Sequence, residues 1–177
     1  RASLISRTLQ DTVGAVREIA YDLRPPSLDQ LGMVRAVAQY CEDFSGVTGV
    51  AVDFSSAGME NMELESGVEV NLFRIIQEGL TNVGKHSGAA SARVRIVSSH
   101  PHILLRVEDD GVGFDPETVL AAAEGENRMG LRGMAERAHI LGGRLRILSS
   151  PGKGARLVVE IPCARRADGD TEEDSHR

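Results

Sequence analysis

The spacing of apolar residues along the chain predicts four helices. In each, apolar side chains recur every three or four positions, which is typical of a helix with one buried face. The predicted helices cover residues 2–23, 33–45, 66–87 and 131–141. The sequence Arg24-Pro25-Pro26 ends the first helix, because the residue before a proline avoids helical geometry. Residues 27–32 are expected to form a connector.

Alternation of apolar and polar residues, bounded by turn-forming residues, predicts five strands. They cover residues 50–56, 91–98, 103–109, 144–149 and 155–161. The last two are joined by Ser150-Pro151-Gly152-Lys153-Gly154, which has the composition of a turn. The helices do not alternate regularly with strands, so a doubly wound fold is not expected. The order instead predicts an α/β sandwich, in which helices cover one face of a mixed sheet.

Two polar segments lack these periodic patterns. Residues 115–128 show no clear periodicity, and residues 164–177 are charged and almost without apolar side chains. The second segment is expected to be a disordered tail. The chain begins at Arg1 within a predicted helix, so it is expected to be a fragment of a longer protein.

Composition narrows the choice of partners and location. Hydrophobic residues make up 41% and charged residues 26%, as in soluble globular proteins, and the formal net charge is -6. That charge argues against a nucleic-acid partner. No apolar run is long enough to span a bilayer and no signal peptide is present, so this fragment is expected to make no membrane contact. Cys41 and Cys163 have no CxxC spacing, which favours a reduced, cytoplasmic setting.

Three glycine clusters are the candidates for ligand binding. Asp109-Asp110-Gly111-Val112-Gly113 follows a strand, Gly130-Leu131-Arg132-Gly133 is expected to open a helix, and Gly152-Lys153-Gly154 joins two strands. Glycine lets the backbone approach a ligand, and a helix N-terminus offers free N–H groups to phosphate. Each cluster alone is weak evidence. Neither a GxxxxGK[ST] loop nor a GxGxxG fingerprint after the first strand is present.

Together with Glu78-Gly-Leu-Thr-Asn82-Val-Gly-Lys85-His86, these clusters resemble the conserved boxes of bacterial sensor histidine kinases. The segment from Glu78 resembles the N box, and the clusters at 109–113, 130–133 and 152–154 resemble the G1, G2 and G3 boxes in that order. The wider family is the ATPase superfamily shared with gyrase, the mismatch-repair ATPases and a major chaperone. The segment LRPPSLDQLGMVRAV resembles the end of the dimerisation helices of nitrate-sensing kinases. The resemblance implies a Bergerat-type ATP-binding fold. It divides the chain into the dimerisation region at 1–32, the catalytic domain at 33–162 and the tail at 163–177.

The resemblance implies a Mg-ATP site and a role for each box. Asn82 would coordinate Mg²⁺, and Glu78, one helical turn earlier, would hold metal-bound water; an isolated pair of this kind would indicate only a solvated helix face. Asp109 would accept a hydrogen bond from the adenine amino group. The remaining residues implied to bind ATP are Lys85, His86, Gly111, Gly113, Gly130, Leu131, Arg132, Gly133, Gly152 and Gly154.

The segment 115–128 would be the lid over the nucleotide, with Arg128 or Arg132 reaching phosphates. One position departs from the pattern. Ala155 stands where the G3 box usually continues with Thr or Ser. Loss of that hydroxyl would weaken nucleotide binding by about 0.5–1.5 kcal/mol, the net worth of one hydrogen bond.

The implied activity is transfer of the ATP γ-phosphate to a histidine on the dimerisation domain, for relay to a cognate response regulator. The full-length protein would be a homodimer. None of the five histidines is placed as the acceptor, which is expected to lie upstream of Arg1. Two alternatives stay open. Anti-sigma-factor serine kinases share the boxes but phosphorylate a partner's serine, and a degenerate domain would bind nucleotide only to regulate a partner.

Overall fold

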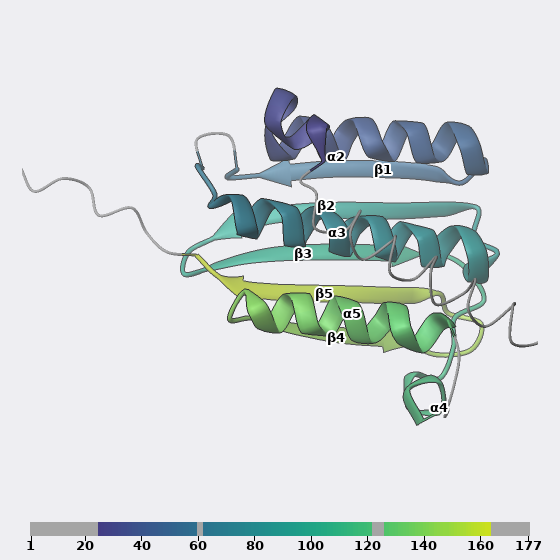
Figure 1. Cartoon of the computed structure of the whole chain (residues 1–177). Helices are drawn as coiled ribbons and strands as arrows, with labels where there is room; N and C mark the ends of the chain where they lie inside the picture. The colour runs from purple at the N-terminus through teal and green to yellow at the C-terminus, as the bar shows by residue number, and fades with distance from the viewer. Residues whose placement is uncertain (1–24, 60–61, 122–125, 164–177) are drawn as a thin grey trace, which may run out of the picture.

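The computed structural model describes residues 25–59, 62–121 and 126–163. The predicted helix at 2–23 and the predicted tail at 164–177 lie outside the described residues. The described part forms two layers, a sheet and a layer of helices (Figure 1). Its strands are β1 (Ala51–Ala57), β2 (Ser91–Ser99), β3 (His102–Asp109), β4 (Arg144–Ser149) and β5 (Ala155–Pro162). Its helices are α2 (Pro26–Thr48), α3 (Ser66–Asn82), the π-helix η1 (Val83–Ser87), α4 (Pro116–Ala121) and α5 (Glu126–Ile140).

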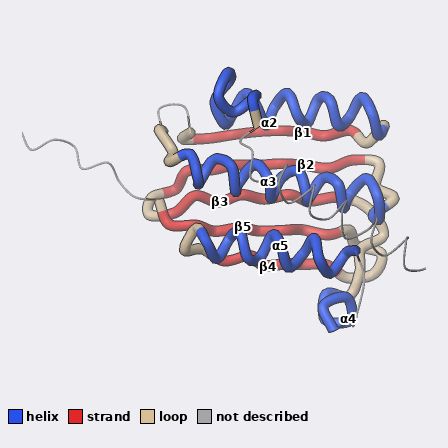
Figure 2. Tube along the Cα trace, viewed as in Figure 1, coloured by secondary structure: helices blue, strands red, loops and turns tan. Residues whose placement is uncertain are grey.

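The sheet is mixed, with strand order β1-β2-β3-β5-β4. β1 and β2 are parallel, and the other neighbouring pairs are antiparallel. Helices α2, α3 and α5 lie side by side over one face of this sheet (Figure 2). The predicted α/β sandwich, with helices on one face, is therefore confirmed.

The core lies between these two layers. Alternate strand residues point toward the helices and are buried, as the period of two predicts. On α3, Leu72, Ile75, Ile76 and Leu80 are fully buried against the sheet. Gly79 on the same face allows close approach, since a Cβ there would lie 3.3 Å from Leu157 Cδ1 and 3.4 Å from Val107 Cγ1. This contact sets α3 directly over β3 and β5.

Three predicted boundaries were wrong. The connector expected over residues 27–32 is helical up to Gly32, because α2 begins at Pro26, a position where proline is preformed for a helix. Gly32, with φ of 73°, kinks the helix there. The helix expected over 66–87 ends at Asn82 and continues as η1. The third error concerns the segment 115–128, where α4 forms and α5 begins at Glu126 rather than at residue 131.

Candidate functional site

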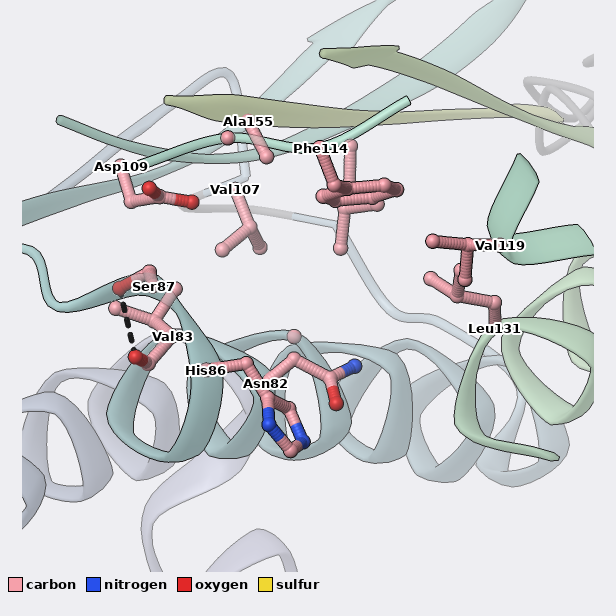
Figure 3. Close-up of a pocket in the computed structure, with 13 residues that line it drawn as sticks. Asn82, Val83, His86, Ser87, Val107, Asp109, Phe114, Val119, Leu131 and Ala155 are labelled. Atoms are coloured by element: carbon pink, nitrogen blue, oxygen red, sulfur yellow. Dashed lines mark hydrogen bonds between the residues drawn. The ribbon is translucent and has the colours of Figure 1, made fainter. Parts of the chain in front are cut away.

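A cavity of about 140 Å³ lies between the sheet and the end of the α3–η1 helix. Figure 3 shows Asp109 and Phe114 on the sheet side, Asn82 and Ser87 on the helix side, and Leu131 at one end. The lining is mainly apolar, with a few polar groups from distant parts of the sequence. Its residues are Gly79, Asn82, Val83, His86, Ser87, Val107, Asp109, Gly113, Phe114, Val119, Leu131, Ala155 and Leu157.

The carboxylate of Asp109 is the acidic group of this cavity. Its Oδ1 accepts a hydrogen bond from Gly111 N–H at 2.8 Å. Burial raises the pKa of Asp109, although the nearby backbone N–H groups of Gly111 and Ala155 favour its ionised form. Asp110 has a different role, because its carboxylate accepts bonds from Ser91 N and Oγ at the exposed edge of the sheet. These contacts make Asp110 the structural member of the pair.

Glu78 and Asn82 meet at the backbone of α5. A Cβ atom added to Gly130 would collide with Glu78 Oε1 and lie 3.6 Å from Asn82 Nδ2. The Asn82 Nδ2 atom is buried and has no hydrogen-bond partner within the part of the chain that the structure describes. Both side chains therefore lie beside Gly130, whose lack of a side chain makes room for them, but only Asn82 also lines the cavity.

Lys85 and His86 are neighbours in η1, but only His86 lines the cavity. His86 lines the cavity, although its ring lies on the side of the helix away from Asp109 (Figure 3). Lys85 is exposed and does not line the cavity. Ser87 ends η1: its Oγ donates to Val83 O at 2.7 Å and accepts from Ala89 N at 3.0 Å. The predicted α-helical spacing, about 100° per residue, does not hold across this segment.

The G3 turn supports the G1 loop by backbone hydrogen bonds. Gly154 N donates to Gly111 O at 2.9 Å, and Gly152 N donates to Val112 O at 2.6 Å. Gly113 has φ of 61°, and a Cβ there would collide with the carbonyl oxygen of Ser150. The glycines of the two boxes therefore let two loops pack backbone to backbone, with Asp109 at the junction.

The sequence comparisons give this arrangement a family. Residues 67–165, more than half of the chain, match the model described as "Histidine kinase-, DNA gyrase B-, and HSP90-like ATPase". The chain belongs to this ATPase family.

Curated relatives of this ATPase domain are sensor kinases by name. It is 34% identical over 158 residues to the signal transduction histidine-protein kinase/phosphatase DegS of Brevibacillus brevis, covering 89% of this chain and 39% of that protein. It is 36% identical over 157 residues to the sensor histidine kinase ComP of Bacillus subtilis, covering 89% of this chain and 20% of that protein. The chain thus spans well under half the length of these two relatives.

Solved structures share the fold. The histidine kinase domain of the Erythrobacter litoralis EL346 blue-light activated histidine kinase matches with a TM-score of 0.58 and 23% identity, covering 73% of this chain and 60% of that one. Full-length ShkA in complex with AMPPNP matches with a TM-score of 0.61 and 19% identity, covering 76% of this chain and 30% of that one. At these identities, the likeness supports the fold of the ATPase domain.

Not every predicted site residue of the domain reaches the cavity. Arg132 is exposed, and Gly133 has no neighbour within 4 Å of an added Cβ. The expectation that Gly130 opens a helix was wrong. It is the fifth residue of α5, whereas only the first four N–H groups of a helix lack an intrahelical acceptor. The Arg128 side chain lies outside the described residues.

Several apolar residues of the site were missed by sequence reasoning. Val107 and Leu157 line the cavity from neighbouring strands, and Phe114 and Val119 line it from beyond the G1 loop. The alternation in these strands marks Val107 and Leu157 only as inward-facing strand residues. Their extra role depends on the gap between sheet and helix, which no local pattern encodes.

Among the described residues, no helix is both long and apolar enough to cross a membrane.

Proposed function

We propose that this chain is the ATP-binding catalytic domain of a sensor histidine kinase. In this role it holds Mg-ATP while the γ-phosphate passes to a histidine on a dimerisation domain, for relay to a cognate response regulator. The observation that carries the proposal is the single cavity shared by Asp109 from the G1 box and Asn82 from the N box. The names of the matched relatives agree with it.

The adenine base is proposed to enter the apolar part of the cavity with its amino group toward Asp109. The half-buried carboxylate of Asp109 is a strong hydrogen-bond acceptor, and closing a ligand over it without a donor would be costly, so it selects a ligand that can donate. The N–H of Gly111 holds the carboxylate in place. Val107 and Leu157 would contact the faces of the base, as in other mainly apolar ligand pockets.

The residues present fit a magnesium ion. The described part of the chain has no cluster of three or more His, Cys, Asp or Glu that could hold a metal alone. Magnesium is commonly held by one or two protein oxygens together with substrate phosphates, so such a cluster is not required. The carboxamide of Asn82 is proposed as the protein ligand, with Glu78 holding an adjacent water. When bound, the ion would neutralise charge on the phosphates.

The phosphates are proposed to lie toward Gly130 and Leu131, near the N-terminal half of α5. Contacts from Lys85, His86, Arg132 and the glycines of the G2 box are proposed for the nucleotide-bound form, in which the segment 115–128 closes as a lid. These residues come from α5, η1 and the segment before α5. A change in the position of α5 would be needed to bring Arg132 to the cavity.

The full-length protein is proposed to be a cytoplasmic-facing homodimer that acts on a response regulator. The matched relatives are two to five times longer than the matched segment, which leaves room for a dimerisation domain carrying the acceptor histidine. We also propose that residues 1–32 belong to the dimerisation region, residues 33–162 form the catalytic domain and residues 163–177 form the tail.

Calorimetry with Mg-ATP on two variants tests the site. Asp109→Asn is expected to lose most ATP affinity because one carboxylate oxygen becomes an NH2 group. With the amide oxygen bonded to Gly111 N–H, that NH2 would face the adenine amino group, donor against donor. Asn82→Ala is expected to lose the magnesium-dependent part of the affinity. Wild-type affinity in both variants would refute the site assignment.

The Asp109→Asn variant is expected to fold. The pKa of this acid is raised in the folded state, so ionisation costs stability as the pH rises through that pKa. A neutral amide avoids that cost and can still accept the bond from Gly111. Thermal unfolding at neutral pH should therefore show no loss of stability, which separates lost binding from lost folding.

A further inference from the structure

The face of the sheet opposite the helices is rich in arginine. Strand positions that alternate with the buried ones point away from the helix layer, which lies on the other face (Figure 1). Three carboxylates, Asp53, Glu108 and Glu160, occupy such positions. The arginines at these positions are all exposed and are Arg93, Arg95, Arg106, Arg144, Arg146 and Arg156. This face is thus basic, although the whole chain has a net charge of -6.

The carboxylates on this face neutralise only part of its positive charge. Glu108 lies between two arginines, with Arg93 Nη1 at 2.6 Å from Oε1 and Arg156 Nε at 2.8 Å from Oε2. Glu160 Oε2 accepts from Arg144 Nη2 at 2.8 Å. These contacts lie in two rows of cross-strand neighbours near the two ends of the sheet.

The row between them has no carboxylate. Arg95 on β2 lies directly opposite Arg106 on β3, which is followed across the sheet by Val158 on β5 and Arg146 on β4. Like charges directly opposite each other on a sheet are destabilising. Within residues 25–59, 62–121 and 126–163, Arg95 and Arg106 have no hydrogen bond or ion pair. We call Arg95, Arg106, Val158 and Arg146 the arginine row.

We propose that the arginine row binds the acidic segment 168–174 of the same chain. This segment, Asp168-Gly-Asp170-Thr-Glu172-Glu173-Asp174, has five carboxylates in seven residues. It would supply the negative charge that the row lacks. Carboxylate–guanidinium pairs are the natural match, because the planar fork of arginine donates two parallel hydrogen bonds to one carboxylate.

The segment is close enough in sequence to reach the row. β5 ends at Pro162, and Val158 lies four residues earlier on that strand, about 13 Å away at the usual rise per residue. Asp168 is the sixth residue after Pro162, and six residues can span up to about 20 Å. A chain that turns back after Cys163 onto the outward face can therefore place residues 168–174 over the row.

The proposed contact lies on the opposite side of the sheet from the inward-facing cavity wall of Val107 and Leu157. It does not require ATP. Its failure would leave the proposed kinase function untouched, and failure of ATP binding would leave this contact untouched.

The test is backbone amide NMR of residues 1–177 at low salt. The wild type is compared with a tail variant in which all five acids of segment 168–174 become Asn or Gln. Backbone amide signals of Arg95, Arg106 and Val158 are expected to shift between the two proteins. The difference should vanish near about 1 M salt, where the screening length falls to about 3 Å.

Two arginine variants supply the controls. In Arg95→Gln with Arg106→Gln, neutralising the tail should no longer move these signals. Because Arg95 and Arg106 are like charges opposite each other, replacing both should leave the domain folded. Well-dispersed amide signals of the double variant would show that it is folded. Arg35→Gln removes an exposed arginine from α2 instead, and should keep the full tail effect.

The proposal is overturned if neutralising the tail leaves the backbone amide signals of the arginine row unshifted. The same shifts in the double glutamine variant would also overturn it. Shifts that grow with protein concentration would mean that the tail of a second copy fills the row, which would contradict the same-chain contact.

Discussion

At the scale of single residues, Ala155 is the position where this chain departs from its family pattern. It lines the cavity together with Asp109. Ala155→Thr would place a hydroxyl beside that carboxylate, and we expect it to tighten ATP binding by about 0.5–1.5 kcal/mol. Calorimetry measures the change, with Ala155→Val as the matched control of similar shape without the hydroxyl. Binding that is unchanged or weaker in the threonine variant would mean that the pocket is adapted to alanine.

Gly113 is the residue on which the packing of the two glycine loops depends most. Its φ of 61° is in the left-handed region, and a Cβ would collide with the Ser150 carbonyl. Gly113→Ala is expected to destabilise the domain by about 2 kcal/mol or more, since the conformation alone costs about 1–2 kcal/mol for other residues. Urea unfolding gives the change in free energy.

Gly46→Ala is the control for that measurement. Gly46 lies in α2 with open space at its Cβ position, so alanine is expected to stabilise the helix by about 0.5–1 kcal/mol. Equal effects of the two substitutions would show that the loop packing does not depend on the glycine at 113.

At the scale of elements, the segment 115–128 is expected to move when ATP binds. α4 has six residues, and helices this short have little stability of their own. Hydrogen exchange over this segment should be fast without nucleotide and slower with a non-hydrolysable ATP analogue. Peptides from α3, whose apolar face is fully buried, serve as the internal reference and should be protected in both states. Strong protection of 115–128 without nucleotide would argue against a lid.

The elements also show which sequence patterns were reliable. The helix over 66–82 was predicted because its apolar face repeats over several turns, and the alternation in β2 and β3 placed both strands within one residue. The start of α5 was misplaced because its first turn is polar and its two glycines were taken as a helix start. Gly130 instead serves the contact with Glu78, which is a tertiary reason for a glycine inside a helix.

At the scale of the whole molecule, this chain is expected not to autophosphorylate. Phosphoryl transfer needs a nucleophile in line with the γ-phosphate, and none of the five histidines of residues 1–177 is proposed as the acceptor. The chain should instead phosphorylate the full-length kinase in trans, when that kinase carries Asn82→Asp and cannot use its own ATP site. Acid-labile label from γ-labelled ATP should appear on that partner.

Replacing the acceptor histidine in the same partner is the control and should abolish the label. Label on a serine would favour the serine-kinase alternative, and no transfer despite ATP binding would favour a degenerate regulatory domain. Label accumulating on residues 1–177 alone would contradict the position given to the acceptor.

Apolar periodicity and glycine spacing are local properties of the chain, so the layers, the strands and the order of the four boxes could be predicted from the residues alone. The same holds for the spacing of Glu78 and Asn82, one turn apart on a helix. Three features could not be predicted in this way: η1 winds as a π-helix, the G3 turn supports the G1 loop, and Val107 and Leu157 line a cavity. Each of these depends on atoms far apart in sequence, whose packing and backbone hydrogen bonds arise only once the sheet and helices have come together.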